Sequence, residues 1–284
     1  MSPTLAWFDG RVVPFESATV PLEDRGLLFG ESLYEVLPVC AGRVRLLAEH
    51  IARMRTCASA LELADGVPDD ATWERLAASL VAGNGIDEGL LYAQLTGGVA
   101  PRLHVPTSRP RPTFWAYLRP FRFPRAEEAA RGVRVIVADD RRWAGSHLKT
   151  TMLLPAVLAK REAQRHGASE ALLIDERGNV REGASSNLFI VDGRTLVTPP
   201  QDRHVLPGIT RDRLAPLAEE AGLEFRREPI PLERLRGARE AFLASTSLLA
   251  MPIVAVEDAP IGDGAAGEIT LDLAARLRRV LEIA

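Results

Sequence analysis

The hexapeptide Ser146-His147-Leu148-Lys149-Thr150-Thr151 holds one of only two lysines among the 284 residues of the chain. The other is Lys160, whereas lysine and arginine together number 35, so arginine carries nearly all of the positive charge. An arginine stays protonated, but a lysine can react as a neutral amine and form a Schiff base. Lys149 is therefore either an amine kept for chemistry or an ordinary loop cation, and its scarcity leaves both interpretations open. Lys160, in the charged helical stretch 156–165, is expected to be solvated.

The composition indicates a globular protein, since 46% of its residues are hydrophobic. A net charge of −3 and a pI near 6.0 give no reason to expect nucleic acid or an anionic membrane as a partner. No apolar run is long enough to span a membrane, and residues 1–7 lack the features of a signal peptide. Cys40 and Cys57 are too few for a disulfide framework and are expected to be buried. These features predict a cytoplasmic protein.

Hydrophobic periodicity and turn residues predict more strands than helices. The predicted strands are 5–8, 11–13, 33–40, 90–95, 114–118, 133–138, 171–175, 180–183, 187–191, 195–198, 223–227, 240–244 and 253–256. The predicted helices are 46–63, 69–81, 150–166, 210–221 and 267–283. Because hairpins are frequent, this pattern favours two α+β domains over a regular βαβ array. Prolines and charges at 121–131 predict a linker between an N-terminal α+β domain, 1–120, and a C-terminal domain, 132–284.

Four short stretches carry polar groups that could bind a ligand. Val205–Thr210 opens a helix, and free N–H groups beside a threonine form either an anion site or a plain helix cap. The small hydroxyl residues at 244–247 are either a second phosphate loop or only a turn. Glu182 ends a strand beside small residues, so its carboxylate either faces a ligand or is a surface charge. Arg102 and His104 could project together toward a carboxylate, or lie in a solvent loop.

The chain contains no zinc-binding spacing, P-loop, Gly-x-Gly-x-x-Gly motif or Gly-x-Ser-x-Gly elbow, so no metal site is predicted. A Schiff-base lysine, anion sites and a placed carboxylate together suit pyridoxal phosphate. That cofactor is an electron sink held by an imine, a phosphate clamp and an acidic partner for its ring nitrogen.

Ordered motifs extend this interpretation over nearly the whole chain, from Trp7 to the last helix. They are Glu23-Asp24-Arg25-Gly26, Phe29-Gly30, Tyr34-Glu35-Val36, Glu49-His50-Ile51-Ala52-Arg53, Pro101-Arg102-Leu103-His104, Lys149, Glu182-Gly183-Ala184-Ser185-Ser186-Asn187 and Gly208-Ile209-Thr210-Arg211. With them the chain resembles the fold-type IV pyridoxal-phosphate enzymes and, among these, is most similar to the D-amino acid aminotransferases. The resemblance implies two α/β domains, the C-terminal one a pseudo-barrel that carries the cofactor lysine.

The resemblance also implies how the cofactor is held. Lys149 would bind it as a Schiff base and move the proton at the substrate Cα. Glu182 would pair with the ring nitrogen and keep it protonated. Leu206 would pack on the ring, and the phosphate would be held by Arg53, by Thr246 and by the backbone at the helix start. The expected cofactor-binding residues are Arg53, Lys149, Glu182, Leu206, Ile209, Thr210 and Thr246.

For the substrate, the resemblance implies a clamp on the α-carboxylate that determines the preference for D-amino acids. Its expected residues are Tyr34, Arg102 and His104, with Tyr92 nearby. In the family, the loop carrying the arginine and histidine reaches the site from the neighbouring subunit, which implies a homodimer.

The implied reaction is a ping-pong transamination between D-amino acids and 2-oxo acids such as pyruvate and 2-oxoglutarate. The alternatives are an aminodeoxychorismate lyase, a branched-chain L-amino acid transaminase and a non-catalytic binding protein of the same fold. Retention of Arg102 and His104 favours the D-amino acid transaminase over the lyase. Two features depart from the family pattern. Gly97 stands where relatives often carry an arginine, and Leu37 and Pro38 are expected to reshape the pocket wall.

Overall fold

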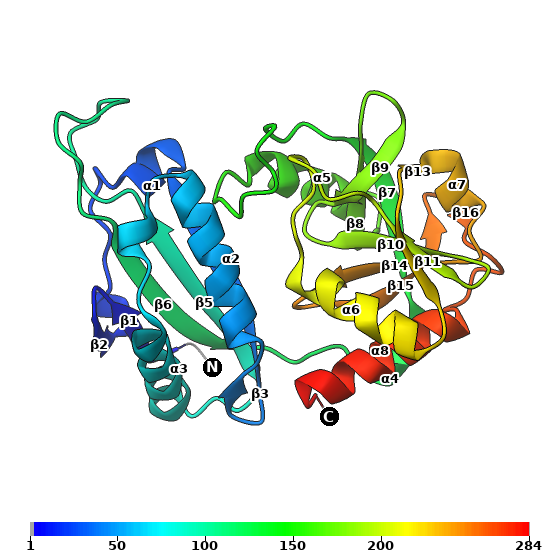
Figure 1. The fold of residues 1–284 in the computed structure, drawn as a ribbon, viewed down its shortest axis with the longest axis horizontal. Helices are drawn as coiled ribbons and strands as arrows, with labels where there is room; N and C mark the ends of the chain where they lie inside the picture. Colours follow the sequence, from blue (N-terminus) through cyan, green and yellow to red (C-terminus); the bar gives the residue numbers. More distant parts are fainter. Residues whose placement is uncertain (1–2, 284) are drawn as a thin grey trace. The chain divides into compact units, whose positions relative to one another are not determined.

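The computed structural model describes residues 3–283, which form two units, each a sheet with helices packed on it (Figure 1). Unit 1 comprises the chain up to Arg122 together with Leu148–Met152. Unit 2 comprises Phe123–His147 and the chain from Leu153 onward. The predicted fold class, two α+β domains with a pseudo-barrel C-terminal domain, is confirmed.

Unit 1 is an antiparallel six-stranded sheet in the order β2-β1-β6-β5-β3-β4. Its strands are β1 (Leu5–Phe8), β2 (Arg11–Pro14), β3 (Ser32–Cys40), β4 (Arg43–Val44), β5 (Gly89–Thr96) and β6 (Thr113–Pro120). Its helices are α1 (Arg25–Phe29), α2 (Leu47–Ala60) and α3 (Asp70–Asn84), with short 3-10 turns at Phe15–Ser17 and Ala64–Gly66. Side chains of α2 and α3 pack with those of the strands into one hydrophobic core. The predicted site residues Tyr34 and Tyr92 lie on this sheet, and Arg53 lies on α2.

Local sequence signals explain several boundaries in unit 1. The Asp9-Gly10 turn joins β1 to β2 with φ values of 45° and 88°, the left-handed region that favours asparagine, aspartate and glycine. The side chain of Asp69 accepts a hydrogen bond from the Thr72 N–H at 2.7 Å, so α3 begins as its cap residue predicts. Pro38 is tolerated because β4 pairs only with the last two residues of β3.

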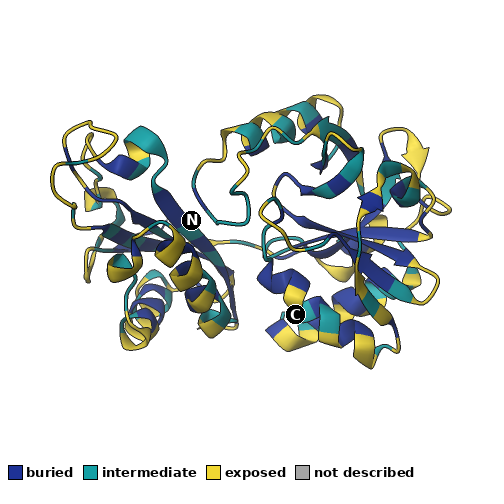
Figure 2. Ribbon diagram, turned by 45° about the horizontal axis from the view of Figure 1, so that its top comes forward, coloured by how far each residue is buried: buried dark blue, intermediate teal, exposed yellow. Residues whose placement is uncertain are grey.

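Unit 2 is a mixed ten-stranded sheet in which β16 pairs with β15 and the other strands follow the order β12-β11-β10-β14-β15-β7-β8-β9-β13. The strands are β7 (Val133–Asp139), β8 (Glu170–Ile174), β9 (Asn179–Gly183), β10 (Asn187–Asp192), β11 (Thr195–Thr198), β12 (Glu224–Arg227), β13 (Ile230–Pro231), β14 (Glu240–Ser245), β15 (Leu249–Val256) and β16 (Ala259–Pro260). The helices are α4 (Ala126–Arg131), α5 (Leu154–Arg165), α6 (Ile209–Glu220), α7 (Leu232–Arg236) and α8 (Glu268–Leu281). Figure 2 shows that buried residues gather on the strands of each unit and on the helix faces toward them.

The expected domain division differs from the observed one at two points. The region 121–131, expected as a linker, includes α4, which packs on β15 and α8 of unit 2. The lysine segment is expected in the C-terminal domain, but Leu148–Met152 belongs to unit 1 because its backbone pairs with β3.

Two element predictions also need correction. The helix expected from residue 150 begins only at Leu154, since the Thr151 N–H donates to the Ser32 carbonyl at 3.2 Å and Pro155 suits a first helical turn. The stretch 21–30, expected as a loop, contains the short helix α1, whose cap is Asp24. None of the helices formed by residues 3–283 is long and apolar enough to cross a membrane.

Candidate active site

Lys149 lies on a segment that adds to the edge of β3. Its carbonyl accepts a hydrogen bond from the Tyr34 N–H at 3.0 Å, and Thr150 forms an isolated bridge with Leu33. The Lys149 Nζ atom lies 4.1 Å from the centroid of the Tyr34 ring, within the range of a cation–π contact. The backbone pairing thus places the predicted reactive amine beside a predicted substrate-binding tyrosine.

Tyr34 and Tyr92 belong to one row of aromatic rings on neighbouring strands. Their centroids are 5.7 Å apart, and Tyr92 stacks in turn on Tyr117 at 5.1 Å. Burial raises the pKa of Tyr92, and Tyr117 and Tyr34 add to the effect, so its hydroxyl stays protonated. That hydroxyl donates to Gln94 Oε1 at 2.7 Å. The predicted pair of tyrosines is therefore brought together with Lys149.

Arg53 is held by a buried carboxylate, Glu35, that sequence reasoning did not single out as a site residue. Glu35 Oε1 accepts from Arg53 Nε at 2.8 Å, and Glu35 Oε2 accepts from Arg53 Nη2 at 2.6 Å and from His50 Nδ1 at 2.7 Å. Burial works to raise the pKa of Glu35, but Arg53 and His50 outweigh it and lower this pKa to about 2. Burial lowers the pKa of His50, which Glu35 only partly offsets. The guanidinium of Arg53 is thus fixed by a permanent anion.

The predicted carboxylate clamp is not assembled within the chain. Among residues 3–283, no hydrogen bond, ion pair or ring contact joins Arg102 or His104 to Tyr34, Tyr92 or Lys149. Both side chains instead lie beside Phe29 of α1. The Arg102 Cζ atom is 5.6 Å from the Phe29 ring centroid, and the His104 ring centroid is 5.5 Å from it.

Glu182, at the end of β9, is the centre of the corresponding cluster in unit 2. Its carboxylate accepts from Asn187 Nδ2 at 2.8 Å, from the Leu206 N–H at 3.2 and 3.3 Å, and from Arg142 Nη1. Burial raises the pKa of Glu182 to about 7, although Arg142 and the Leu206 N–H act in the opposite direction. Glu182 is therefore a buried acid, and the alternative that it is a surface charge is wrong.

Arg142 is a site residue that sequence reasoning missed. Asp140 binds it through both carboxylate oxygens, at 2.9 Å to Nε and 2.8 Å to Nη2, while the His204 carbonyl accepts from Nη2 at 3.0 Å. The pKa of Arg142 is raised because Asp140 and Glu182 outweigh the opposing effect of burial. In a chain with so many arginines, nothing marks this one before its partners are known.

The start of α6 has the free donors that the predicted anion site needs. Gly208 is its N-cap and offers no side-chain cap, so the first N–H groups, including those of Ile209 and Thr210, keep their donors for a ligand. A Cβ atom at Gly208 would lie only 1.8 Å from Asn187 Oδ1, so the close approach requires glycine. Thr246 lies in the turn between β14 and β15.

Lys160 differs from its expected role in one respect. Its side chain is 40% exposed, but its Nζ donates to the Ser169 carbonyl at 2.7 Å and lies 3.4 Å from Glu170 Oε1. Glu170 is fully buried and also accepts from the hydroxyls of Ser185 and Ser186. Lys160 is therefore tied to a buried carboxylate rather than simply solvated.

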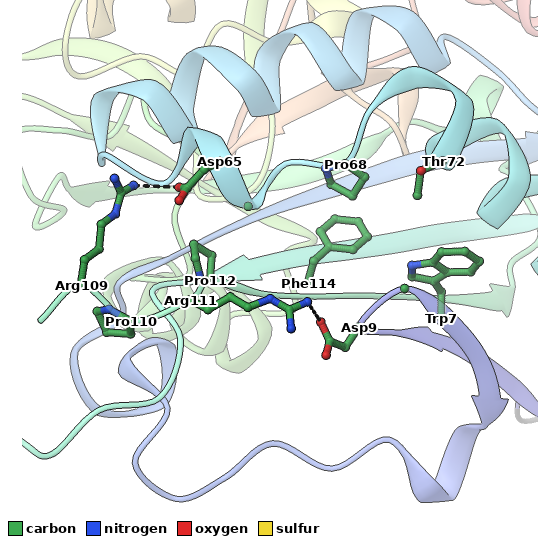
Figure 3. Close-up of a pocket in the computed structure, with 12 residues that line it drawn as sticks. Trp7, Asp9, Asp65, Pro68, Thr72, Arg109, Pro110, Arg111, Pro112 and Phe114 are labelled. Carbon is green, nitrogen blue, oxygen red and sulfur yellow. Dashed lines mark hydrogen bonds and ion pairs between the residues drawn. The ribbon is translucent and has the colours of Figure 1, made fainter.

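One pocket of unit 1 lies where the long loop 97–112 returns to the sheet. Its volume is about 350 Å³, and its lining includes Trp7 and Phe114 but none of the predicted site residues (Figure 3). Two ion pairs flank it, Arg109 with Asp65 at 2.8 Å and Arg111 with Asp9. The pocket thus marks an anchor of the loop, distinct from its Arg102–His104 end.

Comparison with known proteins assigns the family. The model of the amino-transferase class IV family matches residues 32–256. The chain belongs to the class IV aminotransferases. It is 35% identical over 271 residues to the D-alanine aminotransferase of Bacillus licheniformis, covering 95% of each chain, and 32% identical over 281 residues to that of Staphylococcus haemolyticus, covering 98% of each.

Solved structures give the same answer at the level of the fold. The branched-chain amino acid aminotransferase of Escherichia coli matches with a TM-score of 0.85 at 26% identity, covering 98% of this chain and 92% of that one. That of Thermobaculum terrenum, solved in its PLP form, matches with a TM-score of 0.87 at 24% identity, covering 99% and 95%. Fold-type IV aminotransferases use pyridoxal phosphate, so the predicted enzyme class and cofactor are confirmed.

The residues of this aminotransferase fit that cofactor. Unit 2 offers a buried carboxylate, Glu182, and an uncapped helix start behind Gly208 whose N–H groups suit a phosphate. Unit 1 offers an amine, Lys149, and an arginine already oriented by Glu35. These are the three kinds of group that pyridoxal phosphate requires: an imine-forming amine, an anion clamp and an acid for its ring nitrogen.

Proposed function

We propose that this aminotransferase moves amino groups between D-amino acids and 2-oxo acids, such as pyruvate and 2-oxoglutarate, in a ping-pong reaction. The observation that carries the proposal is the Arg102-x-His104 pair, two cationic or hydrogen-bonding side chains that the loop 97–112 presents together beside Phe29. An arginine beside a histidine suits a planar carboxylate. The similarity to two D-alanine aminotransferases over at least 95% of the chain supports the same substrate class.

In this proposal Lys149, Glu182 and Arg53 hold the cofactor, with the N–H groups of Ile209 and Thr210 and the Thr246 hydroxyl at its phosphate, and Leu206 on its ring. When bound, pyridoxal phosphate supplies an electron-withdrawing ring that stabilises negative charge at the substrate Cα. Glu182, as an anion, favours a protonated ring nitrogen. Leu206 has a second role, since its N–H already binds the Glu182 carboxylate.

The remaining steps depend on groups of unit 1. Lys149 Nζ takes the proton from the substrate Cα and returns it on the way to product, as a general base and then a general acid. Tyr34 and Tyr92 lie beside that amine and form one wall for the substrate. Arg102 and His104 bind the α-carboxylate and so set which face of Cα meets Lys149.

We also propose that the enzyme is a homodimer in which this clamp acts at the partner's site. Two observations support it. Arg102 and His104 are exposed and make no hydrogen bond, ion pair or ring contact with Tyr34 or Lys149 of their own chain, as far as residues 3–283 are concerned. Large apolar side chains near them are also exposed, Leu27 at 63% and Val105 at 82%. A dimer mass in sedimentation equilibrium, lost on Val105→Asp, is the expected result. A stable monomer with full activity would exclude this arrangement.

We place this activity in the cytoplasm, which Cys40 and Cys57 support because both are buried, neither forms a disulfide, and reduced thiols are usual there.

A half-reaction panel tests the substrate class. The absorbance of the bound cofactor is followed on adding D-alanine, L-alanine, L-leucine or aminodeoxychorismate, each without an amino acceptor. We expect amination of the cofactor by D-alanine at a rate at least about 100-fold above that with either L-amino acid, the size that one misplaced carboxylate contact produces. The similarity to a solved branched-chain aminotransferase favours L-leucine as the second candidate. A faster reaction with L-leucine, or pyruvate release from aminodeoxychorismate, would overturn the D-amino acid assignment.

The scarcity of lysine allows a direct test of the cofactor attachment. Borohydride reduction should fix the cofactor to the peptide containing Lys149 and leave the peptide containing Lys160 unlabelled. Lys149→Ala should lower turnover by about 10²- to 10⁴-fold while cofactor still binds, because the proton-transfer group is lost. Lys160→Ala is the matched control and should keep most activity. Label on Lys160, or none at all, would contradict the assignment.

A further inference from the structure

Arg25, in the first turn of α1, is a buried arginine outside every role assigned so far. Its side chain is 6% exposed, and each of its nitrogens faces an acceptor. Nη1 donates to the Leu103 carbonyl at 2.7 Å, Nη2 donates to the His104 carbonyl at 3.0 Å, and Nε pairs with the carboxylate of Glu31. One guanidinium thus holds two successive carbonyls of the loop that carries Arg102 and His104.

These bonds matter because residues 101–105 of the loop have few other hydrogen bonds. Residues 101–105 are exposed and have no regular secondary structure. Apart from the two bonds from Arg25, their only hydrogen bond within residues 3–283 is local, from the Leu103 N–H to the Pro101 carbonyl at 2.6 Å. Without Arg25, this stretch would lose its hydrogen bonds to α1.

The side chains of the loop rest on the same short helix. Three side chains lie close to the Phe29 ring. The Arg25 Cζ atom is 4.9 Å from its centroid, the Arg102 Cζ atom is 5.6 Å from it, and the His104 ring centroid is 5.5 Å from it. Asp24, the cap of α1, is fully buried and accepts from the Thr96 hydroxyl at 2.8 Å. The helix that holds the loop is therefore itself fixed to the end of β5.

Gly97 belongs to the same arrangement. A Cβ atom there would lie 2.8 Å from the carboxyl carbon of Glu31 and about as close to both of its oxygens. The Gly97 N–H also donates to the Glu31 carbonyl at 2.9 Å. Since the carboxylate of Glu31 fills the space that a side chain at position 97 would need, Gly97 is what allows Glu31 to reach Arg25.

We propose that Arg25, oriented by Glu31 across Gly97, is a positioning residue for substrate specificity: it sets the loop so that Arg102 and His104 meet the substrate carboxylate together. This inference rests on the proposed role of Arg102 and His104. It also assigns a purpose to Gly97, which departs from the arginine often found in relatives. Arg25 should therefore affect binding of the amino acid and not binding of the cofactor.

Arg25→Met tests the proposal, with Arg109→Met as the matched control. Arg109 anchors the other end of the same loop through Asp65 (Figure 3). For Arg25→Met we expect KM for the preferred amino acid to rise about 10- to 100-fold. The KM for a primary amine that lacks a carboxylate and the Kd of the cofactor should stay within about 2-fold, a split that general destabilisation would not produce. Arg109→Met should leave all three values within about 2-fold. Hydrogen exchange should speed up in peptide 99–105 of Arg25→Met, and not in Arg109→Met.

Glu31→Gln and Gly97→Val keep the test decisive if Arg25→Met folds poorly. Both retain Arg25 but remove or displace its anionic partner, and both should raise KM for the amino acid in the same direction by a smaller factor. Equal KM values for wild type and all three variants would overturn the inference. Arg102→Ala distinguishes a failure of the proposed carboxylate clamp from a failure of the role of Arg25. If it leaves amino acid KM unchanged, the proposed clamp fails; if it raises KM while Arg25→Met does not, only the role of Arg25 fails.

Discussion

Two buried glutamates, one in each unit, each pair with an arginine, yet their pKa values are shifted in opposite directions. Glu35 and Glu182 are both nearly inaccessible to solvent, and each pairs with an arginine. Burial acts to raise both pKa values, yet the pKa of Glu35 is lowered to about 2 and that of Glu182 is raised to about 7. Burial alone therefore does not determine the charge of a carboxylate; the cations available to it do.

The difference lies in how each arginine is shared. Arg53 gives Glu35 two hydrogen bonds, and His50 adds a third. Arg142 gives Glu182 one nitrogen, while Asp140 takes two others. Asp140 also acts directly to raise the pKa of Glu182. Unit 1 thus contains a permanent anion that fixes an arginine, and unit 2 an acid that a cationic ligand could readily ionise.

The largest expected contrast is in the stability of the cofactor-free protein at pH 7.5. Glu35→Gln should lower the free energy of unfolding by about 3–5 kcal/mol, because it leaves Arg53 buried without its anion. Glu182→Gln should instead raise it, by up to about 3 kcal/mol, since glutamine avoids the ionisation that costs stability at this pH and Arg142 keeps Asp140. Urea unfolding followed by circular dichroism measures both. Equal losses in the two variants would mean that the carboxylates do not differ in this way.

A second contrast separates the two glutamates by pH. The pKa of Glu182 is raised from 4.5 to about 7, so the folded state holds a proton that the unfolded state has released, and stability should fall as pH rises from about 4.5 to 7. The pKa of Glu35 is lowered from 4.5 to about 2, so its contribution should be complete above pH 4.5 and be lost as pH falls toward 2. Each effect amounts to about 3 kcal/mol.

Unfolding midpoints at pH 3.5, 5.5 and 7.5 check these signs. Glu182→Gln should flatten the profile above pH 4.5 only, and Glu35→Gln below it only. A wild-type slope above pH 4.5 that survives in Glu182→Gln would assign that slope to another group.

The same contrast shows what the sequence could and could not predict. The β1–β2 hairpin and the start of α3 follow from Asp9-Gly10 and Asp69, because turns and caps are local interactions. Lys149 stands out through its scarcity and through the resemblance. Arg142 could not be found, because its partner Glu182 is 40 residues away and its own residue type is common.

Non-local backbone pairing accounts for the other errors. Nothing near Thr151 indicates that its N–H bonds to Ser32, more than 100 residues earlier, which delays α5 and assigns the lysine segment to unit 1. Likewise, Arg25 reaches Leu103 across 78 residues. Such contacts depend on the register of the assembled sheet, which no local signal specifies.

The smallest effect should come from removing the charge of Asp140, so that Glu182 no longer shares Arg142 with a second carboxylate. Asp140→Asn removes the competing anion, so the pKa of Glu182 should fall from about 7 toward its ordinary value, and the loss of stability between pH 4.5 and 7 should shrink by roughly 1 kcal/mol. Asp139→Asn is the matched control, since its neighbouring carboxylate is 72% exposed and pairs with the exposed Arg141. Carboxyl carbon NMR of glutamate-labelled protein, with Glu182→Gln to assign the signal, measures the shift. Because Asp140 both takes nitrogens of Arg142 and adds a negative charge, an unchanged pKa in Asp140→Asn would mean that burial, and not the sharing of Arg142, separates Glu182 from Glu35.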